Sequence, residues 1–373
     1  MRIVFLSHAC INIALFRLAL IKHLMTLGHE VFVLVPKDEH VQKLLDAKLN
    51  VVHYRIDRRS LNPFKELLTI LSLLKAIKQL RADLIHSFTL KPNVYGLIVA
   101  WALKMQSIQT ITGLGSFYIS NSIKAKIVRF LTQIVYRIFK NTSSASVFQN
   151  PDDMEFFITK KLCHKKRAHL IMGSGIDMDF YSAKFTRSKS LIRSELGLNK
   201  KVVLMVARAI EHKGVREFYA LAKRLCKSYD FVYIGGVDKG NAYAMSEEFL
   251  QDSCVKYLGE KQDVREFYAA CDLFVLPSYK EGLPRTILEA MSFAKPVVAA
   301  RASGSKELIE DGYNGFLVEI ASVDELEIAC DKILSDDALA NAMGKNSHAL
   351  CAQKFSIDII VKEYERLYAC IRA

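Results

Sequence analysis

The chain has 373 residues, of which 51% are apolar. This length and composition exclude a disordered protein and favour two domains, each with its own core. The eight cysteines include no CxxC pair and the histidines no HxxxH or HxH pattern, so we expect reduced thiols and no metal site. No apolar stretch reaches the roughly 18 residues of a membrane-spanning helix, and Met1–Leu6 is typical of a strand rather than a signal peptide. These features predict a cytoplasmic protein.

The positive charge of the chain lies in its first half. The formal net charge is +13. Residues 1–172 contain 25 Lys and Arg against 10 Asp and Glu (net +15), whereas residues 173–373 contain 27 against 29 (net −2). Such an asymmetry suggests an anionic partner for the first half, either a membrane surface or a nucleic acid. No nucleic-acid recognition motif accompanies the charge, so we expect no nucleic acid and favour the membrane.

In residues 1–172, short apolar runs alternate with segments of helical periodicity. The expected strands are Ile3–Leu6, Val31–Val35, Val51–Tyr54, Leu84–His86, Thr110–Ile111 and Ser146–Phe148, and the expected helices span about 12–27, 39–47, 62–81, 92–105, 123–140 and 151–161. This alternation is typical of βαβ units built on a parallel sheet.

The second half repeats the same alternation. Its expected strands are Val202–Val206, Phe231–Ile234, Val255–Leu258, Leu273–Leu276, Pro296–Ala299 and Phe316–Val318. The sequence therefore predicts an α/β protein of two Rossmann-like, doubly wound domains that face each other across a cleft. We place the N-terminal domain at 1–172 and the C-terminal domain at 173–373, because glycines and a polar segment follow residue 172. The last helix, expected at about 356–373, could pack against the N-terminal domain rather than the C-terminal one.

Two helical segments of the basic half combine apolar and cationic residues. The segment 123–140 carries Lys124, Lys126 and Arg129 beside a row of apolar residues, and the Leu-rich segment 60–81 has a similar composition. An apolar helix face bordered by cations is compatible with an anionic membrane surface. The alternative is that both segments are ordinary core helices with solvated edges. The charge of the half favours membrane contact.

One stretch of the second half has the features of an anion-binding turn. The buried strand Leu273–Leu276 ends at Pro277, a polar loop follows, and a helix is expected to begin at Pro284. The loop therefore lies at the carboxyl end of a parallel strand, where ligands bind, and the helix start offers backbone N–H groups to an anion. Glu281 precedes the helix and Glu289 lies within it. Because carboxylates repel phosphate but accept hydrogen bonds from hydroxyls, this arrangement suggests a nucleotide-sugar.

Two cations follow the first strand of the same half. Arg208 and Lys213 come at or just after the carboxyl end of Val202–Val206, on the sheet edge that carries Glu281. An arginine can donate two hydrogen bonds to a phosphate and a lysine adds a point charge, so the pair can balance a diphosphate. The alternative is that each is a solvated surface residue.

The acidic sequence Asp177-Met178-Asp179 resembles a metal-binding DxD motif. It follows Gly173 and Gly175 at the expected domain junction rather than a strand of the donor site. Because aspartate is favoured in turns and caps, we interpret it as a structural turn.

Taken together, these motifs resemble those of the retaining glycosyltransferases of family 4, which have the GT-B fold. The residues that carry the resemblance are Arg208, Lys213-Gly214, Glu281 and Glu289, with Gly235-Gly236 and Leu258-Gly259 between them. Further stretches are similar to a subgroup that extends polyprenyl-diphosphate-linked sugars in bacterial N-glycan assembly: Phe5 to Ala9, Ser60 to Phe64, Gly113 to Ile119 and Leu276 to Gly282. The resemblance covers essentially the whole chain.

The resemblance implies a role for each of these positions. Arg208 and Lys213 would hold the diphosphate of the donor, and Glu289 would hold its ribose hydroxyls. The transferred sugar would contact Glu281 and the amides of Gly282 and Leu283, and uracil the backbone at Leu258 and Gly259. The resemblance implies that Arg208, Lys213 and Glu281 are the catalytic residues.

On the acceptor side, the candidates lie after strands of the first half. His8 follows the first strand and is a candidate acceptor contact, although histidines at strand ends are more often structural, and we rank His86 below it. Gly113 and Gly115 suit a close backbone approach to substrate. Cys10 departs from the glycines that are frequent in the first loop of the family.

The implied reaction moves a hexosamine, with GalNAc as the expected sugar, from a UDP-sugar to an undecaprenyl-diphosphate-linked sugar. It would retain the anomeric configuration and use no metal or other cofactor, at the cytoplasmic face of the inner membrane. The alternatives are a capsule, O-antigen or lipopolysaccharide transferase that uses another UDP-hexose, a UDP-sugar epimerase of similar fold, and a non-catalytic membrane-binding or nucleic-acid-binding module.

Overall fold

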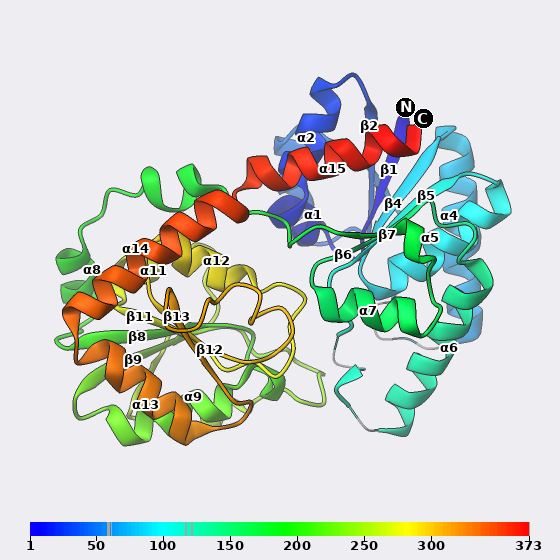
Figure 1. The fold of residues 1–373 in the computed structure, drawn as a ribbon. Helices are drawn as coiled ribbons and strands as arrows, with labels where there is room; N and C mark the ends of the chain where they lie inside the picture. Colours follow the sequence, from blue (N-terminus) through cyan, green and yellow to red (C-terminus); the bar gives the residue numbers. More distant parts are fainter. Residues whose placement is uncertain (58–59, 61, 116–117, 121, 373) are drawn as a thin grey trace. The chain divides into compact units, whose positions relative to one another are not determined.

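The computed structural model describes residues 1–57, 60, 62–115, 118–120 and 122–372, and it divides the chain into two compact units (Figure 1). The first unit comprises Met1–Ser174 and Asp358–Ala373, and the second Gly175–Ile357. The last helix thus counts with the first unit, and the boundary falls at Ser174 rather than at residue 172. Three residues of the family-like stretches, Leu61, Ser116 and Phe117, lie outside the described residues.

The first unit is built on a parallel sheet of seven strands. The strands are β1 (Arg2–Leu6), β2 (Glu30–Val35), β3 (Asn50–His53), β4 (Leu84–Phe88), β5 (Gln106–Ile111), β6 (Ala145–Phe148) and β7 (Ala168–Leu170), in the order β3-β2-β1-β4-β5-β6-β7. The register pairs Ile3 of β1 with Val31 on one side and with Leu84 on the other. Near-continuous apolar strands such as β1 and β2 are expected where helices cover both faces of a sheet.

Helices cover both faces of this sheet. They are α1 (Cys10–Phe16), α2 (Leu18–Thr26), α3 (Val41–Asp46), α4 (Pro63–Leu80), α5 (Leu90–Leu103), α6 (Ile123–Phe139), α7 (Pro151–Thr159) and α15 (Ile357–Arg372). Successive residues of a strand point to opposite faces of the sheet, so neighbouring residues of β4 contact different helix layers. Ile85 packs in the core beneath α4 and α5, whereas His86 contacts α15. Helix α5 packs between α4 and α6.

The side chain of His86 ties the C-terminal helix to the first sheet. His86 is fully buried, and its Nδ1 lies 2.6 Å from the hydroxyl of Tyr368 on α15. Its Nε2 lies 2.8 Å from the hydroxyl of Thr110 on β5. Burial and the nearby Arg17 hold the pKa of His86 well below its ordinary value, so the ring is neutral. His86 is therefore a structural residue that fixes α15 on the sheet.

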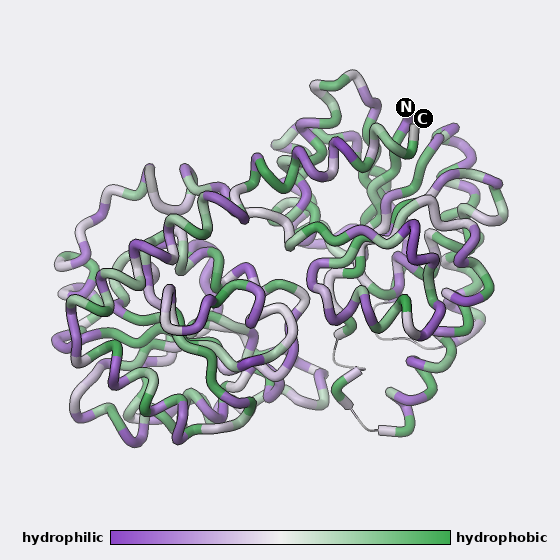
Figure 2. Tube along the Cα trace, viewed as in Figure 1, coloured by the Kyte–Doolittle hydropathy of each residue, from purple (hydrophilic) through white to green (hydrophobic). Residues whose placement is uncertain are grey.

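The second unit repeats the design with six parallel strands. They are β8 (Lys201–Val206), β9 (Tyr229–Ile234), β10 (Val255–Tyr257), β11 (Leu273–Leu276), β12 (Val297–Ala300) and β13 (Gly315–Val318), in the order β10-β9-β8-β11-β12-β13. The helical elements are η3 (Asp179–Ala183), α8 (Lys189–Glu195), η4 (Glu211–Lys213), α9 (Val215–Leu225), α10 (Glu247–Leu250), α11 (Arg265–Ala270), α12 (Arg285–Ser292), α13 (Val323–Leu334) and α14 (Asp337–Lys354). The central strands β8 and β11 are apolar and buried, as their colour in Figure 2 reflects.

In each sheet the strand order reverses once. β1 lies between β2 and β4, and β8 lies between β9 and β11. At such a switch point the connections leave in opposite directions, so the carboxyl ends of two neighbouring strands border an open crevice where ligands bind. His8 follows β1, Lys213 follows β8 and Glu281 follows β11. These three predicted residues therefore lie at the two switch points.

The elements agree with those expected from the sequence, with two informative differences. The expected helix at 12–27 is divided into α1 and α2, because the backbone of Arg17 leaves the helical region (φ −130°) while its guanidinium is buried over the ring of Phe88, 4.5 Å from the centroid. Strand β5 begins at Gln106 rather than at Thr110. Its buried polar residues, Ser107 and Gln109, interrupt the apolar pattern that identifies a buried strand.

Helix α15 provides a direct test of this packing. The substitution Tyr368→Phe removes one hydroxyl and leaves a ring nitrogen of buried His86 without that partner, which costs about 1–3 kcal/mol. We expect the midpoint of thermal unfolding to fall by about 2–4 °C for each kcal/mol lost. The control is Tyr313→Phe at an exposed position, which should leave the midpoint unchanged. An unchanged midpoint for Tyr368→Phe would show that this contact does not hold α15.

Candidate functional site

In the second unit, the loops after β8 and β11 are packed directly against each other. The amide of Tyr279 donates a hydrogen bond to the carbonyl of His212 (2.9 Å). Gly214 has a φ of +74°, and a Cβ atom built on it would lie 2.2 Å from the carbonyl oxygen of Pro277. Only glycine combines this backbone angle with this approach. The Lys213-Gly214 pair therefore brings the lysine against the second loop.

This packing places Lys213 on Glu281. The ammonium nitrogen of Lys213 lies 2.5 Å from Oε1 and 2.7 Å from Oε2 of Glu281. The two side chains are 21% and 9% exposed. At this burial each charge has lost part of its hydration, and the partner offsets part of that cost. The structure thus joins two residues that are 68 positions apart in the sequence and that the motif analysis assigned to one site.

Arg208 lies on the same edge but has a different partner. Its side chain is 59% exposed, and its guanidinium pairs with Asp238 in the loop after β9 (3.0 Å). This carboxylate was not identified from the sequence. Because Arg208 is largely exposed, its side chain is free to reorient toward an anion at little cost in free energy.

The loops after β9 and β10 continue this edge. The amide of Gly235 donates to the carbonyl of Gly259 (2.9 Å), and the amide of Ala209 donates to the carbonyl of Gly236 (2.9 Å). A Cβ atom on Gly235 would lie 1.7 Å from the carbonyl oxygen of Ala207. The backbone at Leu258-Gly259, assigned to uracil by resemblance, therefore belongs to the same row of loops as Arg208.

Helix α12 begins directly after Glu281. Its N-cap is Pro284, which makes no side-chain capping hydrogen bond, and the N-terminus of a helix is the positive end of its dipole, which favours an anion. Gly282 lies close to the loop that follows β12, since a Cβ atom built on Gly304 of that loop would lie 2.7 Å from the carbonyl oxygen of Gly282. The amide of Glu281 also donates to the carbonyl of Ser303 (2.9 Å). The Ser303-Gly304 loop was missed, although a Ser-Gly pair after a buried strand could have indicated it.

Glu289 is buried inside the second unit rather than presented at the loop. Its Oε1 accepts a hydrogen bond from the hydroxyl of Tyr181 (2.8 Å), and its Oε2 accepts one from Tyr268 (2.9 Å). Arg285, one turn earlier on α12, lies 3.3 Å from Oε1. Burial raises the pKa of Glu289, and these three partners partly oppose the rise. The sequence identified the carboxylate but not the tyrosines that hold it.

In the first unit, the residues predicted for the acceptor side follow β1 and β5, the two strands that flank β4. The Nδ1 of His8 lies 2.5 Å from the hydroxyl of Thr89, which follows β4. The Nε2 of His8 lies 3.4 Å from the side-chain amide nitrogen of Asn12. Gly113 lines a pocket that Thr89 also lines, and the carbonyl of Gly115 accepts a hydrogen bond from the amide of Tyr118 at the same pocket (3.1 Å).

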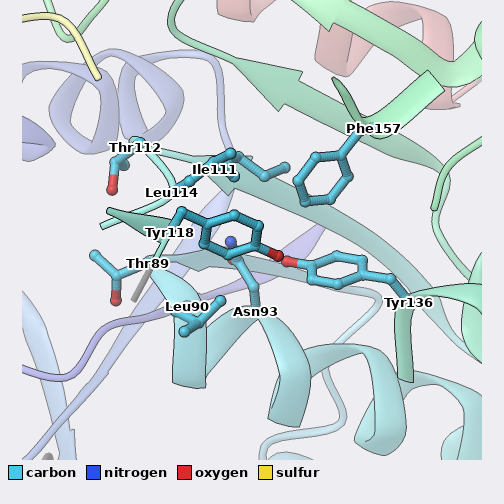
Figure 3. Close-up of a pocket in the computed structure, with 10 residues that line it drawn as sticks. Thr89, Leu90, Asn93, Ile111, Thr112, Leu114, Tyr118, Tyr136 and Phe157 are labelled. Atoms are coloured by element: carbon cyan, nitrogen blue, oxygen red, sulfur yellow. The ribbon is translucent and has the colours of Figure 1, made fainter. Parts of the chain in front are cut away.

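This pocket is small, with room for about one water molecule, and it lies among β5, α5, α6 and α7 (Figure 3). Its lining residues are Thr89, Leu90, Asn93, Ile111, Thr112, Gly113, Leu114, Tyr118, Tyr136 and Phe157. In Figure 3 the hydroxyls of Tyr118 and Tyr136 point toward each other. Leu114 and Tyr118 lie in the family-like stretch Gly113 to Ile119, but apart from Gly113 none of these residues was assigned to a site from the sequence, because they come from separate elements.

The Asp177-Met178-Asp179 sequence forms a helical turn at the start of the second unit. The Oδ1 of Asp177 accepts a hydrogen bond from the amide of Phe180 (2.9 Å), and Asp179 pairs with Lys184 (3.7 Å). Both carboxylates thus have local structural partners. Within the described ranges, no three or more His, Cys, Asp and Glu side chains are grouped so that they could hold a metal ion.

Two protein-family models match the chain, one in each half. The model of glycosyl transferases group 1 matches residues 188–349, which contain the Lys213 and Glu281 loops. The glycosyl transferase 4-like model matches residues 2–144, which contain His8 and the pocket.

Curated relatives cover nearly the whole chain. The N,N'-diacetylbacillosaminyl-diphospho-undecaprenol alpha-1,3-N-acetylgalactosaminyltransferase of Campylobacter jejuni is 38% identical over 99% of this chain and 98% of its own length. The UDP-Gal:alpha-D-GlcNAc-diphosphoundecaprenol alpha-1,3-galactosyltransferase of Escherichia coli is 25% identical over 83% of this chain and 81% of its own.

Solved structures of more distant sequence share the fold. The crystal structure of Anabaena Alr3699/HepE in complex with UDP and glucose has a TM-score of 0.84 at 22% identity, over 99% of this chain and 100% of that chain. WaaG, a glycosyltransferase of lipopolysaccharide biosynthesis, has a TM-score of 0.74 at 17% identity, over 97% and 98% of the two chains. The relative of 38% identity and the two family models agree with the motifs at Lys213, Glu281 and Glu289. The chain therefore belongs to the glycosyl transferases of group 1, with a family 4-like N-terminal half, and is a glycosyltransferase of GT-B fold.

Proposed function

We propose that this glycosyltransferase moves GalNAc from UDP-GalNAc to an undecaprenyl-diphosphate-linked sugar. The observation that supports it most strongly is the contact of Lys213 with Glu281 at the switch point of the second unit, in a chain 38% identical to an N-acetylgalactosaminyltransferase that acts on a diphospho-undecaprenol substrate. A cation and a hydroxyl-accepting carboxylate side by side fit the place where a diphosphate meets a sugar.

The charges of the second unit suggest how the donor binds. Lys213 would donate hydrogen bonds to the diphosphate, and Arg208 would leave Asp238 and add a second contact to it. The N-terminus of α12 would supply backbone N–H groups. Glu281 with the amides of Gly282 and Leu283 would hold the hydroxyls of the transferred sugar. The backbone at Leu258-Gly259 would contact uracil.

Glu289 would hold the ribose through its remaining hydrogen-bonding capacity. A carboxylate offers about four lone-pair positions, and Tyr181, Tyr268 and Arg285 occupy three of them. The two tyrosines would then act as positioning residues that fix the angle of the carboxylate. One position remains for a ribose hydroxyl.

The proposed reaction is a substitution at the anomeric carbon with retention of configuration. The bond from that carbon to the diphosphate oxygen breaks, UDP takes the electron pair, and the acceptor hydroxyl attacks from the same face. The leaving phosphate oxygen takes the proton of this hydroxyl, so no separate base is needed. Lys213 and Arg208 would stabilise the charge that grows on the diphosphate in the transition state. In the proposed reaction these two cations stabilise the negative charge of the diphosphate, which is the role of a metal ion in other transferases.

The first unit has a surface that suits a membrane-embedded acceptor. Helices α4, α5 and α6 bury one side against the sheet and expose apolar residues on the other, and in Figure 2 hydrophobic and hydrophilic stretches alternate along α6. We refer to the exposed apolar residues of these three helices together as the apolar helix face; they are Phe64, Leu67, Leu68, Leu71, Trp101, Ile123, Ile127, Phe130, Leu131 and Ile138. Exposed Lys124, Lys126 and Arg137 border it on α6.

An anionic bilayer fits this face better than another protein does. Apolar side chains that are half exposed or more lose unfavourable hydration when they enter the acyl region, and the bordering cations meet lipid phosphates. The net charge of +15 in residues 1–172 acts in the same direction. Among the described residues no helix is long and apolar enough to cross a bilayer. The proposed association is therefore peripheral, at the inner face of the membrane that carries the acceptor.

A transfer of galactose or another hexose is the second candidate. The Escherichia coli relative is named as an alpha-1,3-galactosyltransferase, and other similar proteins are named for lipopolysaccharide core and capsule assembly. The contacts around Glu281 do not separate these sugars, because the difference lies in single hydroxyl and acetamido groups.

A donor panel tests the proposed function. UDP-GalNAc, UDP-GlcNAc, UDP-Gal and UDP-Glc are each incubated with a lipid-linked N,N'-diacetylbacillosamine, and UDP release and the product are measured. We expect acceptor-dependent release of UDP with UDP-GalNAc at the highest kcat/KM, and an α-linked disaccharide by NMR. A changed sugar released without acceptor would indicate an epimerase, and a β-linkage would contradict retention.

Lys213 should be essential in this assay. The substitution Lys213→Ala removes the partly buried cation proposed to hold the diphosphate, and we expect kcat/KM to fall by about 100- to 1,000-fold, the effect of losing one preorganised charge-stabilising group. The control is Lys223→Ala on α9, a 63%-exposed lysine that pairs with Asp252. Equal activities of the two variants would remove Lys213 from the mechanism.

Membrane binding can be tested on the apolar helix face. In co-sedimentation with vesicles containing phosphatidylglycerol, we expect the double substitution Ile127→Ser and Phe130→Ser to lower the bound fraction several-fold, because each loses apolar burial. Ile328→Ser on α13 is the matched control, since Ile328 is 68% exposed and Phe130 62%. Binding should weaken as salt is raised, because the cations are screened. Failure of the wild type to bind at low salt would disprove the association.

A further inference from the structure

The loop that follows β9 is fixed against the segment that carries Arg208. At the start of this loop, the carbonyl of Gly236 accepts a hydrogen bond from the amide of Ala209 (2.9 Å). At its end, the amide of Met245 donates to the carbonyl of Ala209 (2.8 Å). The loop therefore begins and ends on the residue next to Arg208, and these backbone hydrogen bonds fix where its side chains lie relative to the guanidinium.

Within this loop, Asp238 is itself held in place. Its backbone carbonyl accepts a hydrogen bond from the amide of Asn241 (2.9 Å), and its Oδ2 accepts one from the side-chain amide of Asn241 (3.1 Å). The amide of Tyr243 donates in turn to Oδ1 of Asn241 (3.0 Å). The side chain of Asp238 is 23% exposed and that of Arg208 is 59% exposed. The structure therefore pairs a fixed anion with a cation that has more freedom to move.

This pair involves a cation that the donor is proposed to use. The Nη1 of Arg208 lies 3.0 Å from Oδ2 of Asp238. Carboxylate and phosphate oxygens accept hydrogen bonds from the same guanidinium N–H groups, and like charges held near each other destabilise the state that contains both. Binding of a diphosphate to Arg208 therefore has to weaken a contact that forms again when the nucleotide leaves.

The strength of the pair suits such a reversible exchange. An ion pair between partly exposed side chains changes an equilibrium constant by only about 2- to 5-fold. A fully buried pair would oppose donor binding much more strongly, because separating it would leave an unpaired buried charge. With the exposures of Arg208 and Asp238, the carboxylate can lower the affinity for the nucleotide without preventing its binding.

We propose that Asp238 is a positioning residue that competes with the diphosphate for Arg208 and so accelerates the release of UDP after transfer. The carboxylate holds the guanidinium when the site is empty, loses it to the diphosphate of the donor, and pairs with it again as UDP leaves. The inference rests on the proposed function, in which Arg208 binds the diphosphate. It adds to that function a residue of the loop after β9 that acts through Arg208 rather than on the substrate.

The test measures the affinity and the dissociation rate of UDP on the full chain. Asp238→Asn removes the charge and keeps an oxygen that can accept from Asn241. We expect the Kd of UDP to fall about 2- to 5-fold, mainly through slower dissociation. The matched control is Glu247→Gln, which removes one charge from α10, directly after the same loop, where Glu247 pairs with Lys239 (3.8 Å). This control should leave both values unchanged.

The substitution Arg208→Ala separates the inference from the proposed function. It should raise the Kd of UDP, and in its background Asp238→Asn should have no further effect, because the cation for which the two anions compete is gone. Asp238→Ser, which keeps a hydroxyl for the turn, is the second variant if Asp238→Asn does not fold.

Two results would overturn the inference: a Kd of UDP that is unchanged or higher in the Asp238 variants, or a gain in affinity that persists without Arg208. Equal UDP affinities of the wild type and Arg208→Ala would instead overturn the proposed role of Arg208 in donor binding.

Discussion

The close approach of Gly214 to Pro277 is the constraint on which the donor site depends. A side chain at residue 214 would overlap the backbone of the neighbouring loop, and the positive φ of this residue turns the chain so that Lys213 lies on Glu281. Strands β8 and β11 are neighbours because the sheet reverses its order there. The chemistry attributed to the site thus begins with backbone packing, and the charges of Lys213 and Glu281 are a consequence of where the two loops meet.

The same topological feature accounts for the first unit. His8 and Thr89 follow β1 and β4, the two strands at the reversal of the first sheet, and Asn93 lies one turn into the helix that follows. Each unit therefore builds its site from loops of its own sheet. The second unit offers cations, helix amides and carboxylates, which suit a nucleotide-sugar, whereas the pocket of the first unit is neutral and has room for about one water molecule. The donor is therefore assigned to the second unit.

Much of this organisation could be predicted from the sequence. The strands were identifiable because buried parallel strands are continuous apolar runs, and the placement of Lys213 and Glu281 on one sheet edge followed from motifs at the ends of such runs. The sequence gives no equivalent signal for contacts that depend on side chains from distant segments. The hydroxyls of Tyr181 and Tyr268 around Glu289, and the meeting of Asn93 and Tyr118 at one pocket, depend on such packing. Strand β5 was underestimated for a related reason, since its buried polar residues resemble a surface segment.

Amide hydrogen exchange with and without UDP tests the central claim most directly, because it reports on each loop separately. If the switch point of the second unit holds the nucleotide, UDP should slow exchange in residues 207–214 and 279–287, and in the backbone near 258–259. Residues 112–115, at the neutral pocket of the first unit, should exchange at the same rate in both samples. Protection of 112–115 without protection of 207–214 would contradict the assignment of the donor to the second unit.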